Sequence, residues 1–368
     1  MSRIQSIEAA SVDLDLKESF SISGGASAVA EIVVIRVTLS DGTVGLGEAA
    51  PFVAYDGQSR KAVLEALKSA APAVVGLSPL LSQQIDAQIR ESAPGSSCAQ
   101  VAIEMAALDA LCKSQGFPLW RYLGSKDVSL KTDLTVVAGD LDHAARSAEV
   151  AFQNGFRTLK IKVGRDGVEQ DLARLRAVSS SAPDCGLILD ANGGYTGAEA
   201  ESLMLQASAL EIPVELFEQP VSAADESAMA HLVSLELWPI CADESCRSSA
   251  DAMRISQNRL ADAINIKIQK SGYLETLRII EIARAAGLSL MIGGMIESVL
   301  SMSFSAHLAR GKGVFRWIDL DTPLFIVDHP FVGGISFDNG NVVFQDEATG
   351  HSVSLNNSVL NWQELAMG

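Results

Sequence analysis

Three carboxylates in the middle of this chain have the spacing of a metal site. Asp190, Glu218 and Asp243 each end a short apolar segment, and they lie 28 and 25 residues apart. Three carboxylates brought together repel one another, and proteins relieve that repulsion by protonation or by binding a cation. A ligand set made only of oxygen suits a hard divalent ion, and the pattern offers no histidine or cysteine for zinc. The sequence therefore predicts one Mg²⁺ ion on these three residues.

Lysines stand on both flanks of these carboxylates. Lys160 and Lys162 end one apolar segment, and Lys267 ends another. Lys160 and Lys162 face the same way on a strand, so each disfavours the other's charge and one should have a lowered pKa. A metal ion that binds a substrate carboxylate acidifies the adjacent Cα–H and stabilises the enediolate that forms. Lysines on opposite faces of that carbon could remove one proton and return another, which is racemisation or epimerisation.

Further polar residues share these segment ends. Asn192 lies two residues after Asp190 and faces the same way, and Asp319 and Asp321 form a similar pair in the last segment. Glu244 faces away from the preceding aspartate in an ideal strand, which favours a supporting role or a lysine partner over metal ligation. Any one of these charges alone could be a surface or loop-capping residue. Their common phase favours one shared site.

Eight short apolar segments carry these residues, with starts 24 to 29 residues apart. That spacing is about the length of one strand and one covering helix. Strand–helix alternation predicts a parallel sheet, and eight such units close into a barrel with its active site at the carboxyl ends of the strands. The pattern stops after the last segment, so we expect a (β/α)7β TIM-like barrel of class α/β. The segments start at Leu134, Thr158, Leu187, Val214, Pro239, Ala263, Leu288 and Phe315.

The first third and the end of the chain lack this rhythm. Residues 30–46 alternate apolar and polar side chains across an Asp-Gly pair, which predicts a hairpin, and residues 333–343 predict another. Residues 59–75 and 99–114 are predicted to be helices. We expect three units: an α+β capping domain in residues 1–127, the barrel in 128–323, and a tail in 324–368 that returns to the capping domain.

Composition bounds the class of protein. The 368 residues carry a formal net charge of −17, which argues against nucleic acid as a partner. No apolar run approaches the roughly 20 residues of a membrane span, and the start has no apolar stretch typical of a signal peptide. The five cysteines have neither zinc nor redox spacing and are predicted to be inert thiols. We expect a cytoplasmic homo-oligomer with no membrane or nucleic-acid partner.

The segment ends also match a known family. In chain order they read KxK, DAN, EQP, ADES and NIK. This order resembles the muconate-lactonizing-enzyme subgroup of the enolase superfamily, whose sites use lysine bases with Mg²⁺. The resemblance covers essentially the whole chain. It implies that the three carboxylates bind Mg²⁺, that Lys162 and Lys267 are the two acid/base catalysts, and that Lys160 tunes the pKa of Lys162.

The last segment indicates the substrate. Its Asp319-Leu-Asp321 motif resembles the DxD pair with which dipeptide epimerases of this subgroup hold the substrate's α-ammonium group. An acidic pair suits an ammonium group and would repel an acidic substrate such as muconate. Thr135 resembles a family position close to the substrate carboxylate and a catalytic lysine. The resemblance therefore implies a small dipeptide as the substrate.

The predicted lid loops, residues 20–26 and 51–59, depart from the family pattern. Family members that act on Ala-Glu carry an arginine in a stretch like FRIARG, where this chain reads FSISGG and has no cation. A glutamate side chain would be desolvated there without a partner, which is costly. This favours a neutral or hydrophobic second residue, although Glu18 and Asp56 leave a cationic one open. The predicted specificity residues are Phe20, Ile22, Ser23, Phe52 and Tyr55.

Together these features predict a Mg²⁺-dependent dipeptide epimerase that inverts the C-terminal residue of an L,L-dipeptide through two lysines. Three alternatives stay open. An N-acylamino acid racemase or o-succinylbenzoate synthase would share the metal and lysines but need no ammonium site. A cycloisomerase or β-eliminating enzyme would use the same enediolate. A catalytically inactive metal- or peptide-binding barrel would have no use for opposed bases.

Overall fold

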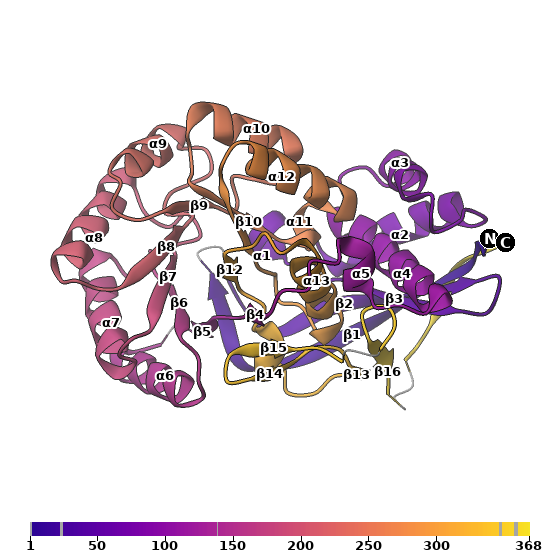
Figure 1. Cartoon of the computed structure of the whole chain (residues 1–368), viewed down its shortest axis with the longest axis horizontal. Helices are drawn as coiled ribbons and strands as arrows, with labels where there is room; N and C mark the ends of the chain where they lie inside the picture. The colour runs from indigo at the N-terminus through magenta and orange to yellow at the C-terminus, as the bar shows by residue number, and fades with distance from the viewer. Residues whose placement is uncertain (1, 23–24, 138, 346–347, 357–359) are drawn as a thin grey trace.

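The larger part of the chain is a curled sheet of eight parallel strands with helices on its outside (Figure 1). The structure, a computed structural model, describes residues 2–22, 25–137, 139–345, 348–356 and 360–368. Each strand pairs in parallel with the next one in chain order. The strands are β5 (Leu134–Val136), β6 (Thr158–Lys162), β7 (Gly186–Asp190), β8 (Val214–Glu218), β9 (Ile240–Ala242), β10 (Ala263–Ile266), β11 (Ser289–Ile292) and β12 (Trp317–Ile318).

The two edges of this sheet meet where the backbone N–H of Asp133 donates to the carbonyl of Ile318 over 2.9 Å. After β12 the described chain forms the short 3-10 helix η1 (Thr322–Phe325) in place of an eighth covering helix. The predicted (β/α)7β barrel is therefore confirmed. The connecting helices are α6 (Leu141–Gln153), α7 (Val168–Ser181), α8 (Gly197–Ala209), α9 (Glu226–Ser234), α10 (Ser249–Asn258), α11 (Ile268–Ser271), α12 (Tyr273–Ala285) and α13 (Val299–Lys312).

A four-stranded antiparallel sheet begins the chain and also ends it. Its order is β17-β1-β2-β3, with β1 (Ile4–Ile22), β2 (Gly25–Leu39), β3 (Val44–Ala49) and β17 (Gln363–Met367). The predicted hairpin joins β2 to β3, and Gly42 takes a positive φ of 84° in its turn. Because β17 pairs with β1, the end of the chain returns to the first sheet as expected. The exact boundaries of the three predicted units stay a prediction.

Helices pack on this sheet and complete a capping layer. The predicted helices appear as α2 (Arg60–Val74) and α4 (Ser97–Gln115). The others are α1 (Val53–Asp56), α3 (Ser82–Ser92) and α5 (Leu119–Leu123). In the tail the predicted hairpin pairs β14 with β15, and β15 also pairs with β4. The remaining short strands are β4 (Leu130–Lys131), β13 (Phe331–Gly333), β14 (Ser336–Asp338), β15 (Asn341–Val343) and β16 (Val353–Leu355).

Strand β3 lies directly against the backbone of α4. A Cβ atom at Gly45 would stand 2.1 Å from the carbonyl oxygen of Ala106, and one at Gly47 would stand 2.1 Å from that of Ala102. Only glycine permits so close an approach. Strand β3 and helix α4 are thus packed tightly together just before the second predicted lid loop begins.

Buried hydrogen bonds join the cap to the barrel. The side chain of Gln269, on α11, donates to the carbonyl of Glu48 over 3.0 Å and accepts from the N–H of Ala50 over 3.2 Å. The backbone N–H of Ser298 donates to the Glu48 carboxylate over 2.9 Å. Buried polar groups that are paired in this way favour one arrangement of the two parts. The lid loop at residues 51–59 therefore starts from a fixed position beside the barrel.

The barrel interior is closed by an apolar layer below the strand ends: Ile188, Leu216, Cys241, Ala263, Met291 and Trp317. All five cysteines are buried and free, which agrees with their prediction as inert thiols. None of the helices in the described ranges is long and apolar enough to cross a membrane.

Candidate active site

Strand register brings the predicted carboxylates together. Lys162 is paired with Asp190 between β6 and β7, and Asp190 is paired with Glu218 between β7 and β8. Asp243 follows Cys241, the partner of Glu218 on β9, by two residues and so shares its side of the sheet. Asp190, Glu218 and Asp243, here called the carboxylate cage, all have 0% exposure.

Lysines supply the countercharge of the carboxylate cage. The Lys160 Nζ lies 3.0 Å from Asp190 Oδ2 and 2.8 Å from Glu218 Oε2. On the other side, the Lys267 Nζ lies 2.7 Å from Asp243 Oδ2. Buried carboxylates of this kind are tolerated only with such partners. The cage is therefore flanked by lysines from β6 and from the end of β10, as the sequence predicted.

These contacts decide which cage acids are ionised. Burial opposes the charge of Asp190, but Lys160 and Lys162 outweigh it and hold the pKa of Asp190 well below its usual range. The pKa of Asp243 is likewise depressed, because its lysine contacts overcome burial. Burial, together with the charge of Asp190, raises the pKa of Glu218. Two ionised aspartates thus stand beside a glutamate that is more easily protonated.

The same contacts raise the pKa of two of the lysines. Burial disfavours the charge of Lys160 and of Lys267, but the surrounding carboxylates raise the pKa of both lysines above the usual value. Lys160 stays charged because three carboxylates contact its ammonium group. Tuning of Lys162 by Lys160 stays a prediction.

Lys162 lies at the open side of the cage. Its Nζ donates to Asp190 Oδ2 over 2.6 Å and to Asn192 Oδ1 over 3.0 Å. Its side chain is 17% exposed, against 4% for Lys160. Asn192 in turn donates to Glu244 Oε1 over 3.1 Å, and burial followed by the charge of the adjacent Asp243 raises the pKa of Glu244 to about 7. Asn192 and Glu244 thus form a chain of contacts behind Lys162.

Two residues that contact the carboxylate cage, Lys270 and Asn265, were not predicted from the sequence. The Lys270 Nζ donates to Asp243 Oδ1 over 2.7 Å and to the Asn265 carbonyl over 2.7 Å. Asn265 itself donates from its side chain to Glu218 Oε1 over 2.6 Å. Asn265 could have been found, because it lies two residues before Lys267 and faces the same way. Lys270 lies on the short helix α11, where the strand phase no longer applies.

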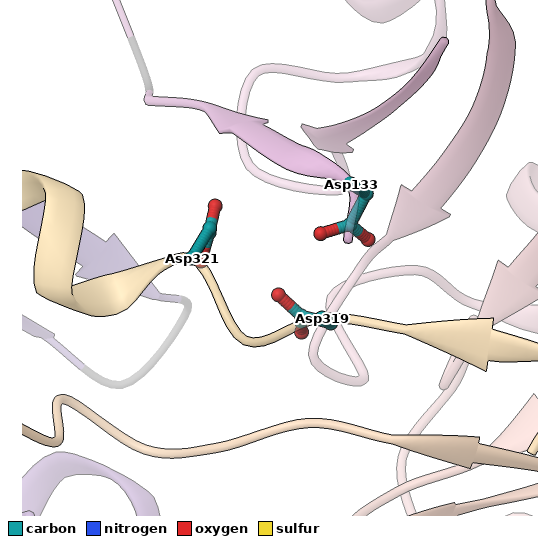
Figure 2. A group of neighbouring side chains, drawn as sticks. All are labelled: Asp133, Asp319 and Asp321. Carbon is teal, nitrogen blue, oxygen red and sulfur yellow. The ribbon is translucent and has the colours of Figure 1, made fainter. Parts of the chain in front are cut away.

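A second acidic group lies beside the cage. Among the described residues, one set of acids has oxygens all within 4.8 Å of one another: Asp133, Asp319 and Asp321, here called the DxD cluster. Figure 2 shows the three side chains converging from the first and last strands of the barrel. The Lys160 Nζ lies 2.7 Å from Asp319 Oδ2, and the N–H of Thr135 donates to Asp321 Oδ2 over 2.6 Å. Asp133 was not predicted.

Fewer lysines contact the DxD cluster than the cage, and the pKa values of two of its acids are raised. Burial, then the charge of Asp319, raises the pKa of Asp321 to about 7. The pKa of Asp133 is raised further, because burial and both neighbouring aspartates oppose its charge and only Lys160 favours it.

One pocket joins these groups. It has a cavity volume of about 50 Å³ and lies between the strand ends and the cap. The predicted lysines, Thr135, Asn192 and both aspartates of the DxD motif reach it, while the cage acids lie beneath. Its lining is Phe52, Tyr55, Thr135, Lys160, Lys162, Asn192, Lys267, Gly294, Met295, Ile296, Asp319, Asp321 and Thr322.

The predicted lid loop at residues 51–59 contacts Asp243 and Lys267 directly. The Tyr55 hydroxyl donates to Asp243 Oδ1 over 3.2 Å, and the Lys267 Nζ lies 5.1 Å from the centre of the Tyr55 ring. Phe52 lines both the pocket and a neighbouring cavity beneath β2. The predictions for Phe20, Ile22 and Ser23 concern side chains outside the described part of the structure.

Two family models match the chain. The N-terminal domain of mandelate racemase / muconate lactonizing enzymes matches residues 6–124, and the enolase C-terminal domain-like model matches residues 143–359. These matches cover both the cap and the barrel and confirm the resemblance drawn from the strand-end motifs.

Individual relatives agree over nearly the full length. An aromatic dipeptide epimerase from Herpetosiphon aurantiacus is 43% identical, over 96% of this chain and 99% of the relative. The crystal structure of a mandelate racemase/muconate lactonizing protein from the same organism has a TM-score of 0.93 at 42% identity, covering 96% of this chain and 99% of the other. A dipeptide epimerase from Enterococcus faecalis V583, solved with Mg and L-Leu-L-Tyr, has a TM-score of 0.92 at 30% identity, covering 96% and 99%. The chain belongs to the mandelate racemase / muconate lactonizing enzyme family of the enolase superfamily.

Proposed function

We propose that this chain is a Mg²⁺-dependent dipeptide epimerase that inverts the Cα of the C-terminal residue of an L,L-dipeptide. The observation that carries the proposal is that one pocket is lined by Lys162 from β6, by Lys267 from the end of β10 and by the acids of the DxD motif. Groups that can transfer protons and groups that can hold an ammonium ion therefore face the same space. Full-length relatives named as dipeptide epimerases support this activity.

The carboxylate cage fits the metal. Its donors are all oxygens, they are fully buried, and two of the three acids are kept ionised by their surroundings. This is the ligand chemistry that Mg²⁺ prefers. Bound there, Mg²⁺ would polarise the substrate carboxylate and make the adjacent Cα–H more acidic. Relatives solved with Mg support Mg²⁺ as the metal, and its placement on Asp190, Glu218 and Asp243 rests on the oxygen chemistry and burial of these three residues.

Lys162 and Lys267 are the proposed proton carriers. They stand on β6 and after β10, on opposite flanks of the cage. In its neutral form one lysine takes the proton from Cα, and the carbon becomes planar. The ammonium group of the other lysine then donates a proton to the opposite face, so the configuration inverts and the composition of the substrate is unchanged. The reverse direction exchanges the two roles.

Asp319 and Asp321 are proposed to bind the α-ammonium group of the dipeptide. Each uses one oxygen for a contact within the protein, with Lys160 and with the Thr135 N–H. A free carboxylate oxygen on each is the partner that an ammonium group needs. An N-acylamino acid racemase, the main alternative, would bind a substrate without that charge.

The second residue of the substrate is proposed to be neutral and hydrophobic. The described lining at the lid side consists of Phe52, Tyr55, Met295 and Ile296, and the lysines of the pocket are engaged by the cage. Close relatives named for aromatic and hydrophobic dipeptides support this preference.

The test is proton exchange in deuterium oxide with L-Ala-L-Xaa dipeptides. The wild-type protein should exchange the Cα–H of the second residue and produce its epimer, as followed by proton NMR. Lys162→Ala and Lys267→Ala should each lower the epimerisation rate by at least about 100-fold, since each removes a proton carrier. Lys68→Ala, on the exposed face of α2, is the matched control. Full epimerisation by either site variant would reject the two-lysine mechanism, and activity only on N-acylated amino acids would favour the racemase.

A further inference from the structure

Asp133 is an acid that the proposed mechanism does not use. It immediately precedes β5 and is 1% exposed. Its backbone N–H donates to Ile318, but neither oxygen of its side chain accepts a hydrogen bond from the described residues. A buried polar group without a partner costs folding free energy, so its presence needs a physical reason.

The neighbours of Asp133 explain which form it takes. The charged groups that face it are Asp319, Asp321 and Lys160, and it makes no ion pair with that lysine because Lys160 contacts Asp319 instead. A third negative charge here would be buried next to two others. Burial and this repulsion raise the pKa of Asp133 and so favour its protonated form. In that form it can donate a hydrogen bond to a neighbouring carboxylate.

The position of Asp133 separates it from the substrate. It is not part of the lining of the active-site pocket, whereas Asp319 and Asp321 are. It lines a different cavity with Thr158, Val214 and Arg316, which lie at the amino ends of their strands. Any influence of Asp133 on the substrate therefore passes through the charged groups that it faces, which are the two aspartates (Figure 2) and Lys160.

We propose that Asp133 is a positioning residue, a neutral acid that donates a hydrogen bond to Asp319 and so aims the free oxygens of the DxD motif at the substrate's ammonium group. This role rests on the proposed dipeptide substrate. Asp319 is then held from two sides, by Lys160 at Oδ2 and by Asp133 from the barrel interior. Functional sites commonly keep groups that reduce stability in this way.

The experiment compares Asp133→Leu and Asp133→Asn with the wild type on one dipeptide. Asp133→Leu removes the donor, and the KM should rise at least about tenfold while kcat changes less than about threefold. The melting temperature, measured alongside, separates a loss of folding from a loss of substrate affinity. Asp133→Asn keeps a donor of the same shape and should return the KM to within about fivefold of the wild-type value. Thr158→Val, which alters the same lower cavity, is the matched control.

Each outcome decides the proposal. An unchanged KM in Asp133→Leu, with only a shifted melting temperature, would show a purely structural residue. A loss in Asp133→Asn as large as in Asp133→Leu would mean that the negative charge matters, and this would also overturn the role. If Asp133→Leu does not fold, the KM of Asp133→Asn alone decides whether the role holds. A wild-type protein that exchanges no dipeptide Cα–H would instead reject the proposed function on which this role rests.

Discussion

The carboxylate cage and the DxD cluster are two acidic groups at one barrel mouth, yet they differ in ionisation. Both consist of three buried acids. The cage is contacted by four lysine ammonium groups, and two of its acids have depressed pKa values. The DxD cluster is contacted by one, at Asp319, and the pKa values of its other two acids are raised. Burial is common to both groups, so the number of nearby cations decides the outcome.

This difference fits two tasks. A set with two ionised acids is ready to hold a divalent cation, whereas the less ionised DxD cluster is suited to a singly charged ammonium group. Residue type alone gives no hint of the distinction, because five of the six acids are aspartates. Variants that change the charge of one group but not the other can break or sharpen the comparison.

The largest effect is expected from the cage. Asp243→Asn removes a proposed metal ligand and leaves Lys267 and Lys270 facing an uncharged amide. Activity should fall at least about 100-fold, because a bound metal ion lowers the activation barrier by several kcal/mol. Rates measured after EDTA treatment, and again during Mg²⁺ titration, should show full recovery for the wild type only. Glu281→Gln on the outer helix α12 is the control. Wild-type activity that survives complete removal of divalent ions would contradict the assignment.

A smaller and more selective effect is expected from the DxD cluster. Asp321→Asn removes a charge that the substrate's ammonium group needs, so the KM for dipeptides should rise about 10- to 100-fold. Steady-state kinetics on a dipeptide and on its N-acetylated analogue distinguish a loss of ammonium binding from a general loss of activity. The variant should lose rate on the dipeptide while leaving the weak activity on the N-acetylated compound unchanged. Equal losses on both compounds would remove the ammonium role.

The smallest effect concerns stability, at a buried acid that has no lysine partner. Glu48 is 0% exposed, and burial raises its pKa to about 8 despite hydrogen bonds from Ser298. Its folded pKa is higher than its unfolded one, so its contribution to stability is complete at low pH. That contribution is lost as the pH rises from about 4.5 to about 8, at up to about 1.4 kcal/mol per unit.

Glu48→Gln should therefore weaken the pH dependence of the unfolding free energy between about pH 5.5 and about pH 8. Urea denaturation of both proteins at these two pH values measures the difference. Glu65→Gln, an exposed acid on α2, should leave the slope as it is in the wild type. A slope in Glu48→Gln equal to that of the wild type would mean that burial alone does not hold this proton.

The strand-end pattern was enough to predict the barrel and most of the site. Parallel strands in register carry a sequence period directly into space, so Asp190, Glu218 and Lys162 could be placed from their spacing. Lys270 could not, because it reaches the cage from a helix after the strand has ended. Asp133 was missed for another reason. It precedes its strand, and only closure of the barrel brings the first strand beside the last.

The lid illustrates what local sequence cannot decide. The segment around Tyr55 was predicted to shape specificity, but its contacts with Asp243 and Lys267 depend on how the cap sits on the barrel. That placement comes from long-range hydrogen bonds such as those between Gln269 and the end of β3. No periodicity in the sequence reports such contacts.

Lys160 touches both acidic groups, with its Nζ 3.0 Å from Asp190, 2.8 Å from Glu218 and 2.7 Å from Asp319. A change of charge on either side therefore acts on the same ammonium group. The barrel mouth is not a set of separable modules, and neither acidic group can be redesigned without disturbing the other.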